Sequence, residues 1–378
     1  MIYLDHNATT PVRPEVFEAM RPFLTERWGN PSSSYAFGSQ LKGVIEEARS
    51  SVASLIGASA REIVFTGSAT ESDNAALNSA LLANSAKRHL VTSAVEHSAI
   101  LNHATFLEKH SYGVTRLPVD REGLLDLATL EAAIQEDTAL VSLMWANNET
   151  GVLFPITEIA AICQRKGVLF HCDAVQAAGK IAIDLRRVPI QYLSLSGHKI
   201  GGPKGVGALF VRKGVPFVPY IHGGHQERGR RGGTENVAGI AGLGCAAALA
   251  RSDLRDYDGI VRPLRDQLED AILVGIPHTE RNGHAVQRLP NTTNITFAGI
   301  ESEALLLLLD KAGVCASAGS ACLADSDEPS HVVRAMKPGL PASRQMIRFS
   351  LGNEILPGDI TNAIQAITHA AQLLRSGR

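Results

Sequence analysis

The chain has 378 residues, a formal net charge of −2 and 45% hydrophobic residues, which is ordinary for a globular enzyme with more than one domain. Such a charge gives no general attraction to nucleic acid or to an anionic membrane, and no apolar run approaches the roughly 18 residues of a spanning helix. The N-terminus lacks the pattern of a signal peptide, and five cysteines without a C-x-x-C pair favour a reduced, cytoplasmic protein over a disulfide framework.

Short apolar runs alternate with helical patterns over the first two thirds of the chain. Each run ends at polar or small residues, and helical patterns follow from about 71, from 98 to 108 and from 156 to 165. This alternation predicts an α/β fold with a mostly parallel sheet, in which ligands bind at the carboxyl ends of the strands. The predicted strands are 63–65, 89–92, 140–144, 168–172, 192–195 and 208–211.

The pattern changes at about residue 258. A long helical pattern at 260–273 is followed by a strand at 294–297, a helix at 302–312, a strand at 347–350 and a final helix. Two strands with interspersed helices favour a smaller α+β unit. We therefore expect a large domain over 15–258 and a small domain formed by 1–14 and 259–378.

Two polar residues at strand ends suggest a covalently held cofactor. Lys199 follows a strand within a small-residue loop, a position from which a lysine amine can form a Schiff base. Asp173 ends another apolar strand, and its buried carboxylate needs a partner such as a pyridinium N–H. The alternatives are a surface lysine in a turn and an aspartate that caps a helix.

Further groups are suited to bind a phosphate and an aromatic ring. The segment 67–71 follows a strand and opens a helix, so its backbone N–H groups and the helix dipole favour an anion. Ser196 and His198 supply further donors, and the flat ring of His97 can stack on a pyridine. A capping box explains 67–71 equally well, and a lone histidine is more often structural.

The segment 316–331 has no helical or strand period and is rich in Gly, Ser, Ala and Asp. This composition predicts an exposed, mobile loop. Cys322 lies within it, and an accessible thiol can ionise and act as a nucleophile, whereas a buried thiol is inert. The alternative is an incidental surface cysteine. The other four cysteines are expected to be small hydrophobic residues.

Several motifs together resemble the cysteine desulfurases, which are fold-type I pyridoxal-phosphate-dependent transferases. The resemblance extends over nearly the whole chain, with the motifs in family order, and the segment 223–236 is most similar to the branch that serves nitrogenase and general iron–sulfur assembly (NifS- and IscS-like). The motifs are LDHNATT at 4–10, GNPSS at 29–33, ATES at 69–72, VEH at 95–97, ANNETG at 146–151, DAVQ at 173–176 and SGHK at 196–199.

This resemblance implies that pyridoxal 5′-phosphate is bound as an aldimine with Lys199. It implies that His97 stacks on the ring and assists proton transfer, that Asp173 pairs with the ring nitrogen and Gln176 with the phenolic oxygen, and that Asn148 lies beside ring and substrate. A homodimer is implied as well, because the family's counterpart of Thr234 reaches the partner subunit's phosphate. The residues implied to hold the phosphate are Ala69, Thr70, Ser196, His198 and Thr234 of the partner subunit.

The resemblance also implies how the substrate is bound and where the sulfur goes. Arg348 binds the substrate carboxylate, assisted by Asn30, because the planar guanidinium fork matches a carboxylate. Cys322 takes the sulfur of L-cysteine as a persulfide and releases L-alanine. The loop is of the long type, although Ala318 replaces a serine common in relatives. The alternative for Arg348 is a strand arginine paired with a nearby acid.

Partners and rival functions remain open at this stage. The sulfur acceptor can be an iron–sulfur scaffold, with which Cys322 can transiently share a cluster, a tRNA-thiolation relay or a nitrogenase-specific partner. The rival functions are an aminotransferase, a selenocysteine lyase and a persulfide carrier with little turnover. The basic run at Arg228, Arg230 and Arg231 is flanked by glutamates and does not favour nucleic acid. His222 and His225 lack a third metal ligand nearby.

Overall fold

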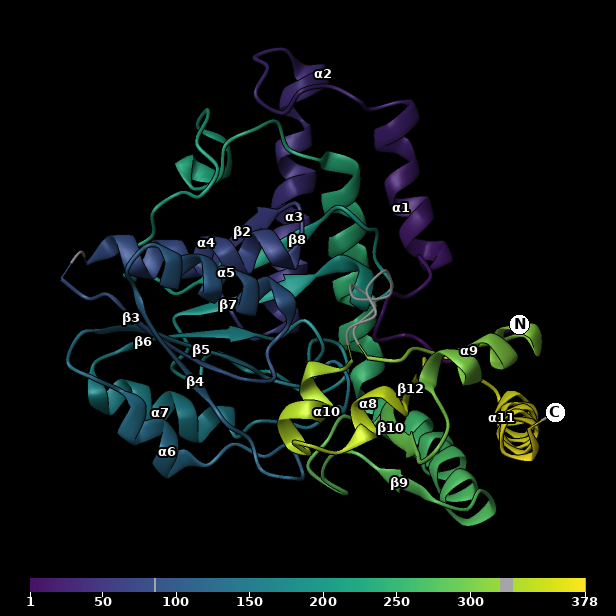
Figure 1. The fold of residues 1–378 in the computed structure, drawn as a ribbon. Coiled ribbons are helices and arrows are strands. Elements are labelled where there is room, and N and C mark those ends of the chain that lie inside the picture. Colours follow the sequence, from purple (N-terminus) through teal and green to yellow (C-terminus); the bar gives the residue numbers. More distant parts are fainter. Residues whose placement is uncertain (85, 320–328, 378) are drawn as a thin grey trace.

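The structure is a computed structural model that describes residues 1–84, 86–319 and 329–377. Its centre is a seven-stranded sheet in the order β2-β8-β7-β6-β5-β3-β4 (Figure 1). Neighbours from β4 to β7 run parallel, and β8 is antiparallel to both β7 and β2. The predicted α/β fold with a mostly parallel mixed sheet is confirmed. The strands are β2 (Ile63–Thr66), β3 (His89–Ser93), β4 (Gly113–Leu117), β5 (Thr138–Met144), β6 (Leu169–Asp173), β7 (Tyr192–Ser196) and β8 (Gly207–Val211).

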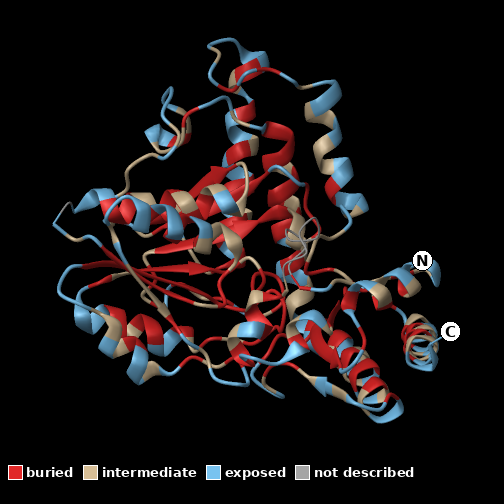
Figure 2. Cartoon of the chain, in the orientation of Figure 1, coloured by how far each residue is buried: buried red, intermediate tan, exposed pale blue. Residues whose placement is uncertain are grey.

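Helices cover both faces of this sheet, which explains why the central strands are nearly continuous apolar runs. In Figure 1, α4 (Ala69–Ala83) and α5 (Ser98–Lys109) lie on one face, and α6 (Leu127–Ala133) and α7 (Ile156–Lys166) on the other. Every residue of β2, β3, β5, β7 and β8 is buried, and Figure 2 shows the sheet as a buried layer.

Helix caps place several helix N-termini at the carboxyl edge of the sheet. The Ser68 hydroxyl accepts a hydrogen bond from the Glu71 backbone N–H (3.1 Å) at the start of α4. The His97 ring accepts one from the Ala99 N–H (3.2 Å) at the start of α5. Each cap satisfies a backbone donor that the first turn leaves free. The residues expected at the site therefore sit where strands end and helices begin.

A second, smaller group of elements packs beside the sheet. β10 (Thr292–Phe297) pairs antiparallel with β9 (Thr279–Arg281) and β12 (Met346–Ser350). The N-terminal β1 (Ile2–Tyr3) pairs in parallel with β11 (Val314–Cys315), so Leu4 packs in a core made otherwise of residues between 257 and 371. The helices of this part are α9 (Ser302–Lys311), α10 (His331–Met336) and α11 (Pro357–Ser376).

One long helix, α8 (Val237–Gly275), connects the two parts and contacts α1 (Pro14–Thr25), α3 (Leu41–Leu55) and α11, while the short α2 (Ala36–Ser39) precedes α3. The expected boundary at 258 falls inside α8, and the helix starts well before the expected 260. By length and composition α8 alone, among the described helices, could cross a membrane. Because 56% of its apolar window is buried, packing against its neighbours accounts for this composition.

Candidate active site

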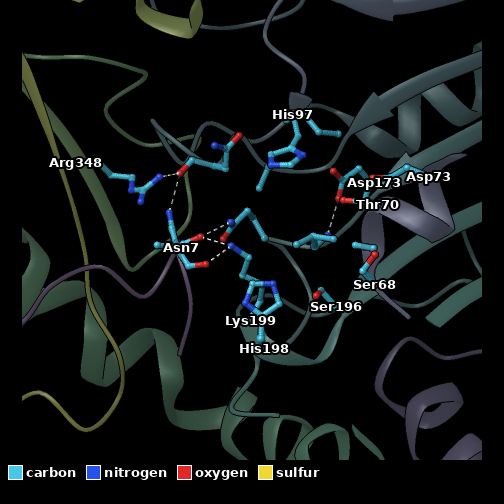
Figure 3. A pocket seen from close by; sticks show the side chains of 17 residues that line it. Asn7, Ser68, Thr70, Asp73, His97, Asp173, Ser196, His198, Lys199 and Arg348 are labelled. Carbon is cyan, nitrogen blue, oxygen red and sulfur yellow. Dashed lines mark hydrogen bonds between the residues drawn. The ribbon is translucent and has the colours of Figure 1, made fainter. Parts of the chain in front are cut away.

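A cavity opens at the carboxyl edge of the sheet, and ten of the thirteen predicted site residues line it. Figure 3 shows Asp173 and Thr70 on one side, Arg348 and Asn7 on the other, and Lys199 and His97 facing the space between them. The geometry thus brings together residues that are up to about 280 positions apart in sequence. The ten are Ala69, Thr70, His97, Asn148, Asp173, Gln176, Ser196, His198, Lys199 and Arg348.

Asp173 is the buried acid of this cavity. It is the last residue of β6, only 7% exposed, and its Oδ1 accepts the Val175 N–H at 2.9 Å. Burial raises the pKa of Asp173 to about 6, although the Val175 N–H and the charge of Lys199 oppose this rise. A cationic N–H donor in the cavity would stabilise the ionised carboxylate. No helix begins after Asp173, because residues 175–180 form turns, so the N-cap interpretation is wrong and the Asp173 carboxylate instead closes the first of these turns.

The N-terminus of α4, opposite the end of β7, is suited to bind an anion. Ala69 and Thr70 lie in its first turn, and Ser196 and His198 face them from the β7 end. Burial, Lys199 and Lys204 lower the pKa of His198 to about 4, so this ring is neutral at pH 7 and its Nδ1 lies 3.1 Å from the Thr9 hydroxyl. Backbone N–H groups and neutral donors of this kind suit a phosphate.

Lys199 follows β7 in a single 3₁₀ turn, Gly197–Lys199. Its amine donates to the main-chain carbonyls of Asn7 and Ala8, the latter at 2.7 Å. The predicted ring partner Gln176 uses its amide nitrogen to donate to the Asn7 carbonyl (3.0 Å). The N-terminal segment thus contacts both groups that the sequence analysis assigned to the cofactor.

His97 combines two roles in one position. It caps α5 and also lines the cavity, where burial, followed by the charges of Lys199 and His331, lowers its pKa to about 4. The neutral ring can stack on a planar ligand and accept or hand on a proton.

Arg348 is buried in β12 and reaches the cavity from the small part. Its Nη2 donates to Asp5 Oδ1 (2.6 Å), and its Nη1 donates to the carbonyls of Gly319 (2.9 Å) and Asn148 (3.2 Å). The pairing with an acid that the sequence analysis weighed as an alternative therefore exists. Among the described residues, Arg348 Nε and Asn148 Oδ1 are buried without a hydrogen-bond partner, so two polar atoms remain for a ligand.

Three predicted residues are not in this cavity. Asn30 is exposed, and its Oδ1 accepts the Ser32 N–H (2.9 Å). Thr234 is exposed and lines a separate hollow beside Gly67. Cys322 lies outside the described residues. At the two described ends of its loop, Gly319 contacts Arg348, and the Ser330 hydroxyl donates to Glu149 Oε2 (2.5 Å).

The sequence analysis missed three residues around this site. Asn7 and Asp73 line the cavity, and Lys180 hydrogen-bonds to Asn7 and Gln176. Burial and the charge of Asp173 raise the pKa of Asp73. Spacing alone could have indicated two of them, because Asp73 is one helical turn after Thr70 and Lys180 is four residues after Gln176.

Comparison with known proteins identifies the family. The model of the class-V aminotransferases matches residues 2–362. Cysteine desulfurase 2 of Trichormus variabilis is 52% identical over 378 residues, which is 100% of this chain and 94% of the relative. The chain belongs to the cysteine desulfurases of the class-V aminotransferase family.

Solved structures of relatives agree with this family. A NifS-like protein matches with a TM-score of 0.92 at 36% identity and covers 97% of this chain and 98% of its own. SspA, solved in complex with cysteine, matches with a TM-score of 0.82 at 35% identity, over 93% of this chain and 99% of its own. The fold-type I assignment made from the sequence is therefore confirmed.

Membership of the class-V family implies pyridoxal 5′-phosphate as the cofactor, and the cavity fits this molecule. A buried carboxylate suits the ring nitrogen, a helix N-terminus suits the phosphate, a lysine amine lies between them, and the Asn148 amide oxygen has no partner among the described residues. The first three of these features match the parts of the cofactor, and the amide oxygen leaves a polar atom for a ligand beside them.

Proposed function

We propose that this cysteine desulfurase removes the sulfur atom of L-cysteine with Lys199 as the covalent anchor of its cofactor and Cys322 as the first sulfur acceptor. The carbon–sulfur bond of the substrate breaks, a sulfur–sulfur bond forms on Cys322, and a proton replaces sulfur on the carbon skeleton, which leaves as L-alanine. The single observation that best supports this proposal is the meeting of Asp173, Lys199 and Arg348 in one cavity.

The cofactor would be held from three sides. Asp173 would accept from the ring nitrogen, Gln176 would donate to the phenolic oxygen, and the α4 N-terminus with Ser196 and His198 would hold the phosphate. When bound, pyridoxal phosphate supplies an electron sink for charge that develops at the substrate α-carbon. The Val175 N–H and the charge of Lys199 oppose the effect of burial and favour the ionised form of Asp173, and an ionised acid stabilises a protonated ring nitrogen.

Arg348 would orient the substrate, and two bases would move its protons. The Nε of Arg348, which has no partner among the described residues, and the nearby Nη2 form one edge of the guanidinium, which can donate two hydrogen bonds to a carboxylate in the fork geometry. The Lys199 amine and the neutral His97 ring, which both line the cavity, would take up and return a proton at the substrate α-carbon.

A second subunit and a sulfur acceptor complete the proposal. We propose a cytoplasmic homodimer in which the partner's copy of Thr234 reaches the phosphate seat and Asn30 assists at the substrate. Their exposure outside this chain's own cavity supports it, as does the exposed aromatic surface of Trp28 (70%) and Tyr35 (59%) beside Asn30. Iron–sulfur assembly is the typical destination for sulfur in this family, and a scaffold protein would take the persulfide from Cys322.

The decisive test measures alanine and sulfide from L-cysteine with pyridoxal phosphate and a reductant. We expect both products from the wild type and neither from Cys322→Ser, because the serine hydroxyl cannot form a persulfide. Cys245→Ser is the matched control, since Cys245 is part-buried and lies outside the cavity. Equal activity of Cys322→Ser and wild type would contradict the proposed sulfur transfer and favour an aminotransferase or simple lyase.

A further inference from the structure

Lys180 is a buried lysine next to the active site that the proposed reaction leaves without a role. Its side chain is 6% exposed. The segment after β6 forms hydrogen-bonded turns, with the Lys180 and Ile181 N–H groups donating to the Ala177 carbonyl. These turns place Lys180 on the same side of the chain as Gln176, four residues earlier. The pair therefore forms one unit that faces the N-terminal segment.

The Lys180 amine contacts two amide oxygens. Its Nζ donates to Gln176 Oε1 (2.8 Å) and to Asn7 Oδ1 (3.2 Å). No carboxylate lies within ion-pair distance of it among the described residues. The charged groups that act on it are Lys199 and Arg348, both cations. Burial and these two charges lower the pKa of Lys180 well below its usual value.

Burying a lysine without a counter-charge lowers the stability of the folded state, so we expect the hydrogen bonds of Lys180 to serve a function. The two acceptors require two N–H donors, and the amine supplies at least two whether it is protonated or neutral. The hydrogen-bond pattern therefore does not depend on the charge state of Lys180. What the pattern fixes is the orientation of the two amides.

The Gln176 amide is held at both ends. Its oxygen faces Lys180, which donates, and its nitrogen faces the Asn7 carbonyl, which only accepts. Rotating the amide by half a turn would place a donor against a donor and an acceptor against an acceptor, which costs the desolvation of each unpaired group. The amide N–H groups therefore point to the side on which Lys199 lies.

Asn7 is held in the same way. Its Oδ1 accepts from Lys180 and from Asn291 (3.1 Å), while its Nδ2 donates to the Asn148 carbonyl and to the Thr292 hydroxyl (2.9 Å). The Asn7 carbonyl in turn accepts from the amine of Lys199 and from the amide nitrogen of Gln176. Lys180 thus contacts Asn7, to which the Lys199 amine donates, and Gln176, which donates to the same carbonyl, as Figure 3 lets the reader follow for Asn7 and Lys199.

We propose that Lys180 is a positioning residue that orients the side-chain amides of Gln176 and Asn7 beside the amine of Lys199, so that a Gln176 N–H donor faces the phenolic oxygen of the cofactor. The inference rests on the proposed function, because it assumes that the cofactor is bound at Lys199. Without Lys180 only the Asn7 carbonyl still holds the Gln176 amide, so its N–H donor is aimed less firmly at the phenolic oxygen and stabilises negative charge there less well.

The test is a pH titration of the visible absorption of the bound cofactor in Lys180→Met, a change that keeps the side-chain length but removes its donors. Losing a donor at the phenolic oxygen favours the protonated form of the cofactor. We therefore expect the absorption midpoint to move to higher pH by about 0.5–1 unit, in line with the loss of one hydrogen bond. Lys166→Met, on the exposed face of α7, is the matched control and should leave the midpoint unchanged.

The double variant, Lys180→Met with Gln176→Ala, distinguishes a positioning role of Lys180 from a role in packing alone. If Lys180 acts through Gln176, then Lys180→Met adds little to the midpoint shift of Gln176→Ala, whereas independent effects would add. An unchanged midpoint in Lys180→Met, or additive shifts, would overturn the inference while leaving the proposed function intact. A wild type that binds no pyridoxal phosphate would instead overturn the proposed function. Should Lys180→Met not fold, Lys180→Gln retains an NH2 group on a shorter, planar side chain and should give a smaller shift; no shift would again contradict the inference.

Discussion

The two sides of the active site are built in different ways. The sheet-edge group, which consists of Thr70, His97, Asp173, Ser196 and His198, comes from residues at or just after the ends of four strands, β2, β3, β6 and β7. The cross-chain group, which consists of Asn7, Asn148, Lys180 and Arg348, is joined by hydrogen bonds between segments that are far apart in sequence. The first group depends on one rigid sheet, whereas the second depends on contact between the large and small parts of the molecule.

This difference predicts different kinetic roles. Sheet-edge residues and Lys199 would act on the cofactor and so on kcat, whereas Arg348 would act on substrate binding and so on KM. This assignment of kcat to one side and KM to the other would be wrong if variants on both sides changed the same kinetic constant.

The largest effect is expected for Lys199→Ala. The variant would remove the proposed covalent anchor and proposed proton-transfer group, so kcat for alanine formation should fall by about a thousandfold or more. The measurement is single-turnover alanine formation with added pyridoxal phosphate, with Lys166→Ala as the control for loss of a lysine elsewhere. Retention of more than a tenth of wild-type kcat would show that Lys199 is not the essential group.

A smaller effect is expected for Arg348→Lys. Lysine keeps the positive charge but lacks the planar fork, so KM for L-cysteine should rise about tenfold to a hundredfold while kcat changes less. Because Arg348 also pairs with Asp5, the thermal unfolding of the variant should be measured beside its kinetics. A drop in kcat at constant KM would assign Arg348 to the chemistry and would break the proposed division.

The smallest effect is expected for Glu96, beside the sheet-edge group, and it concerns the free energy of unfolding and not catalysis. Glu96 is fully buried behind the sheet edge, and burial raises its pKa to about 8 despite hydrogen bonds from Ser93 and Met144. Between about pH 4.5 and 8 the folded state therefore binds the extra proton, so stability falls as pH rises through this range. Glu96→Gln should be close to wild type at pH 5 and more stable than wild type by a few kcal/mol at pH 8.5, where the wild type has lost the stability that the raised pKa gives at low pH.

Thermal unfolding at the two pH values measures this difference. The exposed Glu158→Gln on α7 is the control, because it removes a carboxylate that pays no burial cost. If Glu96→Gln raised the stability equally at pH 5 and pH 8.5, packing around residue 96, and not the ionisation of Glu96, would account for the increase.

Much of the fold and of the sheet-edge group could be predicted from local sequence. Apolar runs that end in Asp173 or in the 196–199 loop mark the carboxyl ends of strands, and parallel strands bring these ends to one edge. The sequence pattern predicts only the second half of the continuous helix α8. The small residues at 237–250 give little helical periodicity, although they pack against α1 and α3. The predicted roles of Asn30, Thr234 and Cys322 stay predictions.

The sequence by itself determined the α/β class, the family motifs and the residues that follow strands, because these depend on patterns within a few neighbouring residues. Only the tertiary structure revealed that the Asn7 carbonyl accepts a hydrogen bond from Lys199 and that Asp73 lines the same cavity as Asp173. The same holds for the ion pair of Arg348 with Asp5 and for the burial of Lys180 against two side-chain amides. These contacts join positions separated by up to 343 residues, and no local period encodes them. They arise because β1, β12 and the sheet edge are brought together by packing, which a linear pattern does not record.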